Sequence, residues 1–217
     1  MAESLQLYDY WRSSSAYLVR IALNLKGLSY RQIPVHLVRD GGQQNREDYR
    51  ELNPLGLVPV LVHGKHVIVQ SMAICEYLEE RFEALPLLPP DTEGRARVRG
   101  LVQTVCAEIQ PLNNLSVMQY LKSEVGLDST HYGAWYAHWI ARGFRAIETW
   151  LSSDASGDFC HGNQPGLADC YLVPQVYNAE RFKCDMEPYP RIRDIVSRCR
   201  ALEAFSRAAP EAQPDAE

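Results

Sequence analysis

The spacing of apolar residues changes character at one place in the chain, a proline-rich stretch at residues 84–91 that reads Ala-Leu-Pro-Leu-Leu-Pro-Pro-Asp. Proline continues neither a helix interior nor a central strand, so this stretch is expected to be a linker. Before it, strand-like alternation and helix-like spacing follow one another, whereas only helical spacing recurs after it. We therefore predict an α/β domain over residues 1–83 and an all-helical domain over residues 92–217.

The first domain has the order strand, helix, strand, short helix, two strands, helix. Leu18, Ile21, Ala22 and Leu25 lie at helical spacing, and Gly27 follows where a left-handed cap would end the helix. The predicted segments are a strand over residues 5–10, a helix after the serines that includes residues 18–25, a strand over 30–37, a short helix over 46–52, a hairpin over 58–70 and a helix over 71–82. Elements in this order can form a compact α/β unit in which helices cover a single sheet.

The second domain carries helical patterns only. They extend over residues 95–121, 132–151, 168–182 and 191–202. Residues 210–217 contain prolines and polar residues, and we expect them to be loosely held.

Charge and composition exclude several classes of function. The net charge of −5 and the lack of a basic run argue against binding to nucleic acid or to an anionic membrane. No apolar stretch is long enough to cross a bilayer and no secretory leader is evident, so a cytoplasmic protein is expected. The six cysteines form no Cys-x-x-Cys pair and the six histidines form no ligand motif, so we predict reduced thiols and no metal.

Three consecutive serines, Ser13, Ser14 and Ser15, stand where the first strand gives way to the first helix. One serine would be explained by helix capping, but three offer more donors than a cap requires. The positive end of a helix suits an anion, and a thiolate is an anion. A nucleophilic serine of the hydrolase kind is less favoured, since no Gly-x-Ser-x-Gly elbow and no evident base accompany these residues.

Two further places in the first domain could bind a ligand. Val58-Pro59 interrupts a strand, which indicates either a bulge or a cis peptide that turns the Val58 backbone toward a peptide-like ligand. Gln70-Ser71 repeats the strand-to-helix layout. Ser71 is expected to be an N-cap, and the pair could also bind a carboxylate and an α-amino group.

In the second domain, Gln103, Ala107, Gln110 and Asn114 share one face of the predicted helix 95–121. This stripe is either a solvated face or one wall of a binding cleft. Arg181 is similarly either a surface ion-pair residue or an anion-binding residue.

Taken in order along nearly the whole chain, these motifs resemble the zeta class of glutathione transferases, whose best-known members are maleylacetoacetate isomerases. The motifs are YWRSSS at residues 10–15, VRIAL at 19–23, DGGQQ at 40–44, LNP at 52–54, VP at 58–59, QS at 70–71, EYLEE at 76–80, QPLNNL at 110–115, DCYLVPQ at 169–175 and NAERF at 178–182. The resemblance implies a thioredoxin-like first domain, an all-α second domain, glutathione as cofactor and a homodimer.

The resemblance also implies roles for individual residues. The serine cluster Ser13–Ser15 would face the sulfur of glutathione, with Ser13 as the main thiolate-stabilising hydroxyl. Arg12 and Arg181 would bind an anionic substrate. Contacts to glutathione would come from Gln44, Val58, Pro59, Gln70, Ser71, Gln110 and Asn114.

The implied reaction is a cis–trans isomerisation of a doubly anionic ene-dione acid such as maleylacetoacetate, in which a thiolate adds to the double bond and later leaves. Rival functions are maleylpyruvate isomerisation, conjugating or dehalogenating transferase activity, and a non-catalytic interaction module. Maleylpyruvate isomerases carry arginines where this chain has Leu115-Ser116.

The chain departs from the family pattern at three positions. Ser15 stands where Cys is common, Leu18 where Arg is frequent, and Gly166 where a helix cap is usually Ser or Thr. Any role of that cysteine is therefore either filled by a hydroxyl or lost, and Leu18 removes a possible anion contact. Gly166 should still be tolerated as a cap, with Asp169 at the third helical position.

Overall fold

The computed structural model describes residues 4–217, and the chain divides into two compact units. The sheet unit contains the residues up to Leu87 together with Ala201–Glu217, and the helical unit is Leu88–Arg200. The predicted second domain ran from residue 92 to residue 217. The structure differs at its far end, because the chain returns to the sheet unit after Arg200.

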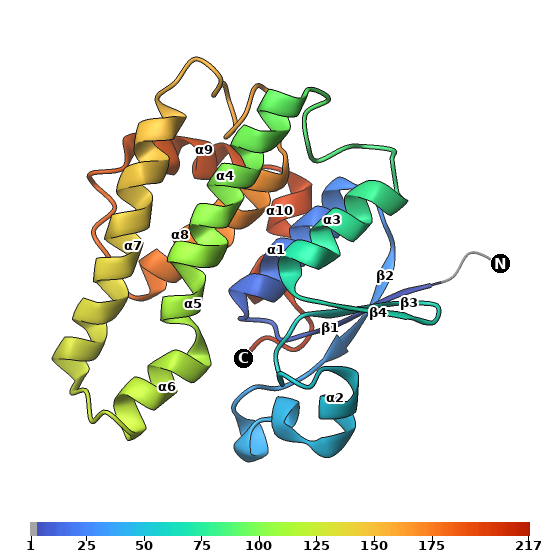
Figure 1. The fold of residues 1–217 in the computed structure, drawn as a ribbon, viewed down its shortest axis with the longest axis vertical. Helices are drawn as coiled ribbons and strands as arrows, with labels where there is room; N and C mark the ends of the chain where they lie inside the picture. The colour runs from blue at the N-terminus through green and yellow to red at the C-terminus, as the bar shows by residue number, and fades with distance from the viewer. Residues whose placement is uncertain (1–3) are drawn as a thin grey trace. The chain divides into compact units, whose positions relative to one another are not determined.

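The sheet unit is built on four strands in the order β2-β1-β3-β4 (Figure 1). Strand β1 pairs in parallel with β2, whereas β3 is antiparallel to both β1 and β4. The antiparallel β3–β4 hairpin confirms the turn expected near His63-Gly64. The strands are β1 Leu5–Asp9, β2 Tyr30–Pro34, β3 Val60–His63 and β4 His66–Val69.

Successive side chains along each strand point to opposite faces of this sheet. Leu7 and Leu61 are opposite each other and fully buried, on the face where helices α1 (Ser14–Leu25) and α3 (Ser71–Arg81) pack together. Neighbouring positions point the other way. On that second face, Val60 joins a cluster with Tyr49 of the short helix α2 (Glu47–Leu52), so helices cover both sides of the sheet (Figure 1).

Arg20 of α1 is completely buried and organises the centre of the sheet unit. Its Nη1 donates to Asp9 Oδ2 at 2.9 Å, its Nη2 to Trp11 O at 2.9 Å and its Nε to Ala208 O at 3.0 Å. Gln32 of β2 adds a second donor to Asp9, at 2.9 Å. Burial raises the pKa of Asp9, and the adjacent guanidinium opposes that rise. The buried pair is tolerated because each nitrogen of the guanidinium donates to an oxygen and each oxygen of the carboxylate accepts from a nitrogen.

The expectation that residues 210–217 are loosely held is wrong. Helix α10 (Glu203–Ser206) packs on α1, and the 3-10 turn η3 (Pro210–Ala212) leads to the buried side chain of Gln213. Gln213 Nε2 donates to Ala209 O at 2.7 Å, and its Oε1 accepts from Gln32 at 3.1 Å. Polar residues here form internal hydrogen bonds, which composition alone does not reveal.

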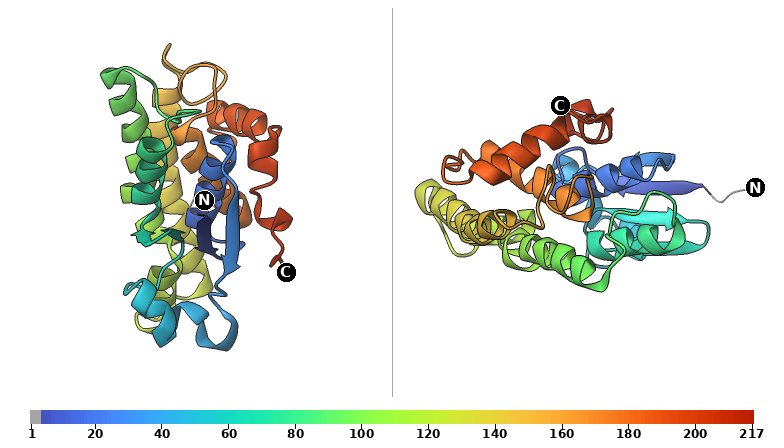
Figure 2. Two further views of the ribbon diagram at one scale, coloured as in Figure 1. Left: turned by 90° about the vertical axis from the view of Figure 1, so that its right-hand side faces the viewer. Right: turned by 90° about the horizontal axis from the view of Figure 1, so that it is seen from above.

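The helical unit consists of α4 to α9, with α4 and α7 side by side and α8 packed against both α4 and α9 (Figures 1 and 2). The bounds are α4 Thr92–Glu108, α5 Gln110–Asn113, α6 Leu115–Ser123, α7 Ser129–Leu151, α8 Leu167–Arg181 and α9 Pro190–Arg200. Helix α8 is buried over most of its length and forms the core. Gly166 is its N-cap, and the Asp169 carboxylate accepts from the Gly166 N–H at 2.8 Å, as expected.

The predicted continuous helix over 95–121 is wrong, since the structure has three helices there. The first break is at Ile109, two residues before Pro111, which has no N–H to donate and stands in the first turn of α5. The Ile109 side chain fills the space where Gly143 of α7 has no Cβ. The second is at Asn114, which caps α6. None of the helices in residues 4–217 combines the length and apolarity needed to cross a membrane.

Replacing Arg20 with Met should destabilise the protein by about 3–5 kcal/mol, because Asp9 would be left as a buried carboxylate without a cation. The free energy of unfolding in denaturant measures this. The matched control is Arg207→Ala, whose ion pair with Glu203 is exposed and should contribute less than about 1 kcal/mol. Equal losses in the two variants would contradict the role given to Arg20.

Candidate active site at one edge of the sheet

The register of the sheet gathers most of the predicted site residues at one edge. Tyr8 pairs with Val60, and Val60 pairs with Val69. The end of β1, the beginning of β3 and the end of β4 are therefore neighbours. The serine cluster follows β1, Val58-Pro59 precedes β3 and Gln70-Ser71 follows β4, so all three segments meet at the same edge.

Ser13 occupies the N-cap position of α1. Its backbone is extended, its Oγ accepts from Ala16 N at 3.3 Å, and its own N–H donates to Tyr10 O at 2.9 Å. The capping interpretation is therefore correct for this serine. Capping uses the hydroxyl only as an acceptor, so the hydroxyl hydrogen can still be donated to an anion.

Ser14 and Ser15 are the first two residues of α1 and are half-buried. The backbone N–H groups in the first turn of a helix have no intrahelical acceptor. Helix α3 begins at Ser71, at the same edge of the sheet. Two helix N-termini thus bring partial positive charge to one place, a setting that favours a thiolate or a carboxylate.

The peptide bond between Val58 and Pro59 is cis, as the resemblance implies. The ladder of β3 begins at Val60, so the backbone of Val58 lies just outside it. The preceding carbonyl, Leu57 O, accepts from Tyr49 Oη and from Asn53 Nδ2, both at 2.8 Å. These two donors hold the segment that leads to Val58.

Sequence reasoning missed the part played by Tyr49 and Asn53. A signal was present in Leu52-Asn53-Pro54, because an asparagine before proline tends to organise a turn through its side chain.

Gln70, not Ser71, occupies the N-cap position of α3, which corrects the prediction for Ser71. Gln70 has φ 71°, in the left-handed region that a residue with a Cβ rarely adopts. Such a conformation costs about 1–3 kcal/mol, and it is typical of residues held in place for binding. Gln70 is exposed and Ser71 is half-buried, so both can reach a ligand at this edge.

Gln44 belongs to the 3-10 turn η2 (Gln43–Asn45), which follows another, η1 (Arg39–Gly41). Its Nε2 donates to Leu37 O at 3.2 Å. Its Oε1 is buried, and no donor within the described chain reaches it. An orphaned acceptor of this kind fits a ligand that brings an N–H group.

Arg12 is half-buried, and its guanidinium carbon lies 5.1 Å from the centroid of the Trp11 ring. This cation–π contact holds the side chain beside the serine cluster while the charge stays available.

Gln110, Asn114 and Arg181 belong to the helical unit. Because the chain breaks at Ile109 and Asn114, the predicted stripe of Gln103, Ala107, Gln110 and Asn114 does not lie along a single helix. Asn114 Oδ1 accepts from Val117 N at 3.0 Å and from Ser116 Oγ at 2.8 Å, which leaves the N–H groups of its side-chain amide for a ligand. Gln110 Nε2 is buried, with no acceptor for it in residues 4–217.

Arg181 is exposed at the end of α8, with its guanidinium carbon 5.2 Å from the centroid of the Phe182 ring. Phe182 stacks on Tyr136, with ring centroids 3.6 Å apart and planes 10° from parallel. Burial raises the pKa of Tyr136, and the charge of Arg181 opposes that rise. The aromatic pair supports a guanidinium that is free to bind an anion.

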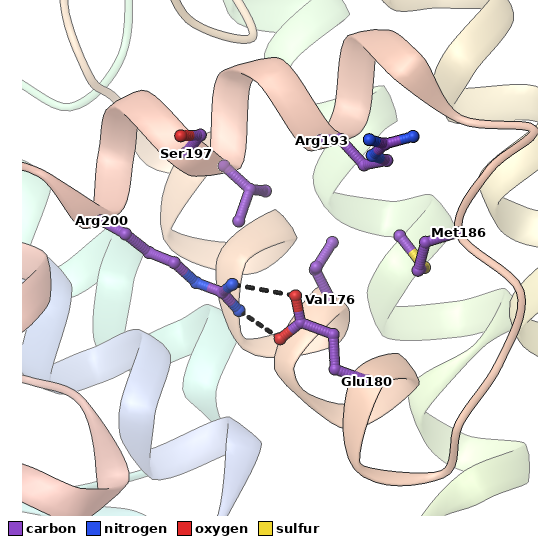
Figure 3. A pocket seen from close by; sticks show the side chains of 7 residues that line it. Val176, Glu180, Met186, Arg193, Ser197 and Arg200 are labelled. Carbon is purple, nitrogen blue, oxygen red and sulfur yellow. Dashed lines mark hydrogen bonds and ion pairs between the residues drawn. The ribbon is translucent and has the colours of Figure 1, made fainter.

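A cavity of about 360 Å³ lies between α8 and α9 in the helical unit (Figure 3). Across it, Arg200 pairs with Glu180 through two hydrogen bonds, of 2.9 and 2.7 Å. None of the predicted site residues lines this cavity. The lining residues are Val176, Glu180, Met186, Arg193, Val196, Ser197 and Arg200.

Comparisons with known proteins agree with this geometry. Residues 3–80 match the model of the N-terminal domain of glutathione S-transferases. A probable maleylacetoacetate isomerase of Vibrio cholerae is 49% identical over 98% of this chain and 99% of its own. These matches confirm the predicted fold class, a thioredoxin-like domain followed by a helical part.

Two solved structures are also similar. The holo structure of a maleyl pyruvate isomerase, described as a bacterial zeta-class glutathione S-transferase, has a TM-score of 0.95 and 46% identity, covering 98% of this chain and 100% of that one. A maleylacetoacetate isomerase from Anaeromyxobacter dehalogenans 2CP-1, with glutathione in its active site, has a TM-score of 0.90 and 47% identity, covering 100% and 99%. The fold and the site define a glutathione transferase. Within that class, the chain belongs to the zeta-class, or maleylacetoacetate isomerase, family.

Proposed function

We propose that this protein is a glutathione-dependent cis–trans isomerase that converts maleylacetoacetate to fumarylacetoacetate, a step of tyrosine and phenylalanine catabolism. The observation that carries the proposal is the sheet edge where three serines and two helix N-termini meet beside the cis Val58-Pro59 bond. The similarity to maleylacetoacetate isomerases over nearly the full length supports it.

The residues at this edge fit glutathione. The Val58 backbone would pair with its cysteinyl part, and Gln70 with Ser71 would hold its γ-glutamyl end, where a carboxylate faces the N-terminus of α3. The orphaned Gln44 Oε1 would accept from an N–H of the tripeptide. Gln110 and Asn114 are proposed to add polar contacts. When bound, glutathione supplies a thiolate that adds reversibly to the conjugated double bond and permits rotation before it leaves.

The chain's own contribution is to hold negative charge. A free thiol has a pKa of about 8.5 and is mostly protonated at neutral pH. The Ser13 hydroxyl would donate to the sulfur while it caps α1, and the N–H groups of the first turn would add partial positive charge. Ser14 and Ser15 would assist. Together these groups lower the pKa of the bound thiol.

Two arginines are proposed to bind the substrate's negative charges. Arg12 stands beside the serine cluster, and Arg181 is exposed on an aromatic support. Guanidinium groups bind carboxylates through paired hydrogen bonds and stabilise an enolate oxygen where charge develops.

A second candidate function is maleylpyruvate isomerisation, favoured by the TM-score of 0.95 to a maleyl pyruvate isomerase. Zeta-type conjugation or dehalogenation, and a non-catalytic role, remain alternatives to test. From the resemblance we also propose a homodimer and a cytoplasmic location.

An assay of the purified protein with maleylacetoacetate and with maleylpyruvate, each with and without glutathione, tests the function. Turnover should require glutathione, be faster with maleylacetoacetate, and leave the thiol concentration unchanged, because the thiolate is regenerated. Depletion of thiol would indicate conjugation. Failure to bind glutathione in a thermal-shift measurement would favour a non-catalytic role.

Replacing Ser13 with Ala should lower kcat by about 10- to 100-fold, since a hydrogen bond to a charged group contributes roughly 1.5–3 kcal/mol. The KM for glutathione should change little. Ser13→Thr keeps both the hydroxyl and the cap and should retain most of the activity. Turnover of the Ala variant at the wild-type rate would remove Ser13 from this role.

Replacing Arg181 with Ala should raise the KM for the dianionic substrate by about tenfold, through the loss of a charge-assisted contact. Arg193→Ala is the matched control, because Arg193 is an exposed arginine of the same unit that lines the α8–α9 cavity. Steady-state kinetics of both variants measure this effect. An unchanged KM in Arg181→Ala would refute the assignment of Arg181 as a substrate-binding residue.

A further inference from the structure

Both peptide groups that flank Trp11 are held by side chains from other parts of the sheet unit. The Trp11 N–H donates to Asp215 Oδ2 at 3.2 Å, and Trp11 O accepts from Arg20 Nη2 at 2.9 Å. Trp11 lies inside the turn that the Ser13 N–H closes on Tyr10 O at 2.9 Å. The orientation of this turn sets where Ser13 stands.

The acceptor on Asp215 is itself fixed in space. Two residues before it, Gln213 donates to Arg207 O at 2.9 Å and to Ala209 O at 2.7 Å, and accepts from Gln32 of β2. Two residues after it, Glu217 pairs with His36 Nε2 at 3.1 Å. The segment 207–217 is thus anchored on both sides of the residue that contacts the turn.

Two buried polar atoms belong to the residues of this contact. Asp215 Oδ1 and Trp11 Nε1 are both buried, and neither has a hydrogen-bond partner within residues 4–217. A buried polar atom without a partner costs stability.

We propose that Asp215 is a positioning residue, which holds the Trp11 peptide so that Ser13, Ser14 and Ser15 present their hydroxyls and first-turn N–H groups correctly. This inference rests on the function proposed for the serine cluster. Asp215 and Arg20 act on opposite ends of one residue: the first holds its N–H and the second its C=O. Without Asp215, the Trp11 N–H loses its acceptor, and the turn keeps only the Arg20 contact to Trp11 O and its own Ser13–Tyr10 hydrogen bond.

The test compares Asp215→Ala, Asp215→Asn and the control Glu217→Ala. Asp215→Ala should lower kcat by about tenfold or more with little change in the KM for glutathione, because a small displacement of a catalytic group is costly. Asn keeps an oxygen acceptor for the Trp11 N–H, so Asp215→Asn should restore most of the rate. Glu217→Ala removes a partly exposed ion pair of the same segment and should behave as wild type.

Hydrogen exchange measures the positioning without any assay of turnover. Amides of residues 11–16 should exchange faster in Asp215→Ala than in Asp215→Asn or Glu217→Ala, at a temperature where all three are folded. Unchanged exchange in the Ala variant, or an equal loss of kcat in all three variants, would overturn the inference. If the wild-type protein isomerises neither substrate, the proposed function fails, while the exchange data still decide whether Asp215 holds the turn.

Discussion

The sheet unit depends on one buried cation. Arg20 has no exposed surface, and its three nitrogens contact the end of β1, the turn that follows it, and a carbonyl almost two hundred residues further along the chain. A buried guanidinium is unfavourable unless nearly all of its donors are satisfied. The end of the first strand, the beginning of the first helix and the segment 207–217 must therefore adopt mutually compatible positions. Asp9, the anion of the pair, also accepts a hydrogen bond from Gln32, so the position of β2 is constrained as well.

The place of the proposed site follows from where the strands end. Because β3 runs against β1, three loops that are distant in sequence meet at a single edge, and two helices start there. Helix N-termini and hydroxyls stabilise an anion through partial charges. The proposed thiolate site is therefore compatible with a chain of net charge −5.

The predictable parts of the structure are those decided by local pattern. Leu18, Ile21 and Ala22 are fully buried, as their helical spacing indicated, and the β3–β4 hairpin forms where alternation predicted it. Helical spacing alone did not predict the breaks in the helix expected over 95–121. The first had a local signal that the helical spacing alone passed over, because Pro111 cannot donate a helical hydrogen bond and stands in the first turn of α5. The second depends on Asn114, whose side chain is equally compatible with a polar face and with a cap.

Partners that are far apart in sequence account for the other errors. Nothing local to residues 210–217 indicates that Gln213 will bond to Gln32, so composition suggested a loose segment. The N-cap of α3 is Gln70, whose backbone is left-handed, and not Ser71, the residue that the usual preference for serine at N-caps predicted. Among the proposed site residues, the serine cluster, Val58-Pro59 and Gln70-Ser71 were predicted from motifs. Asn53 had a signal in Leu52-Asn53-Pro54, whereas Tyr49 and Asp215 act on the backbone and have no comparable signature.

The return of the chain to the sheet unit after Arg200 has a consequence for biosynthesis. Domains generally fold in the order in which the ribosome delivers them. Here the first unit cannot reach its final form when residue 87 emerges, because the Arg20 guanidinium still lacks the carbonyl of Ala208. The intervening helical unit is fully translated before that acceptor exists. The nascent amino-terminal part therefore lacks one of the three acceptors of Arg20 until residue 208 has been made.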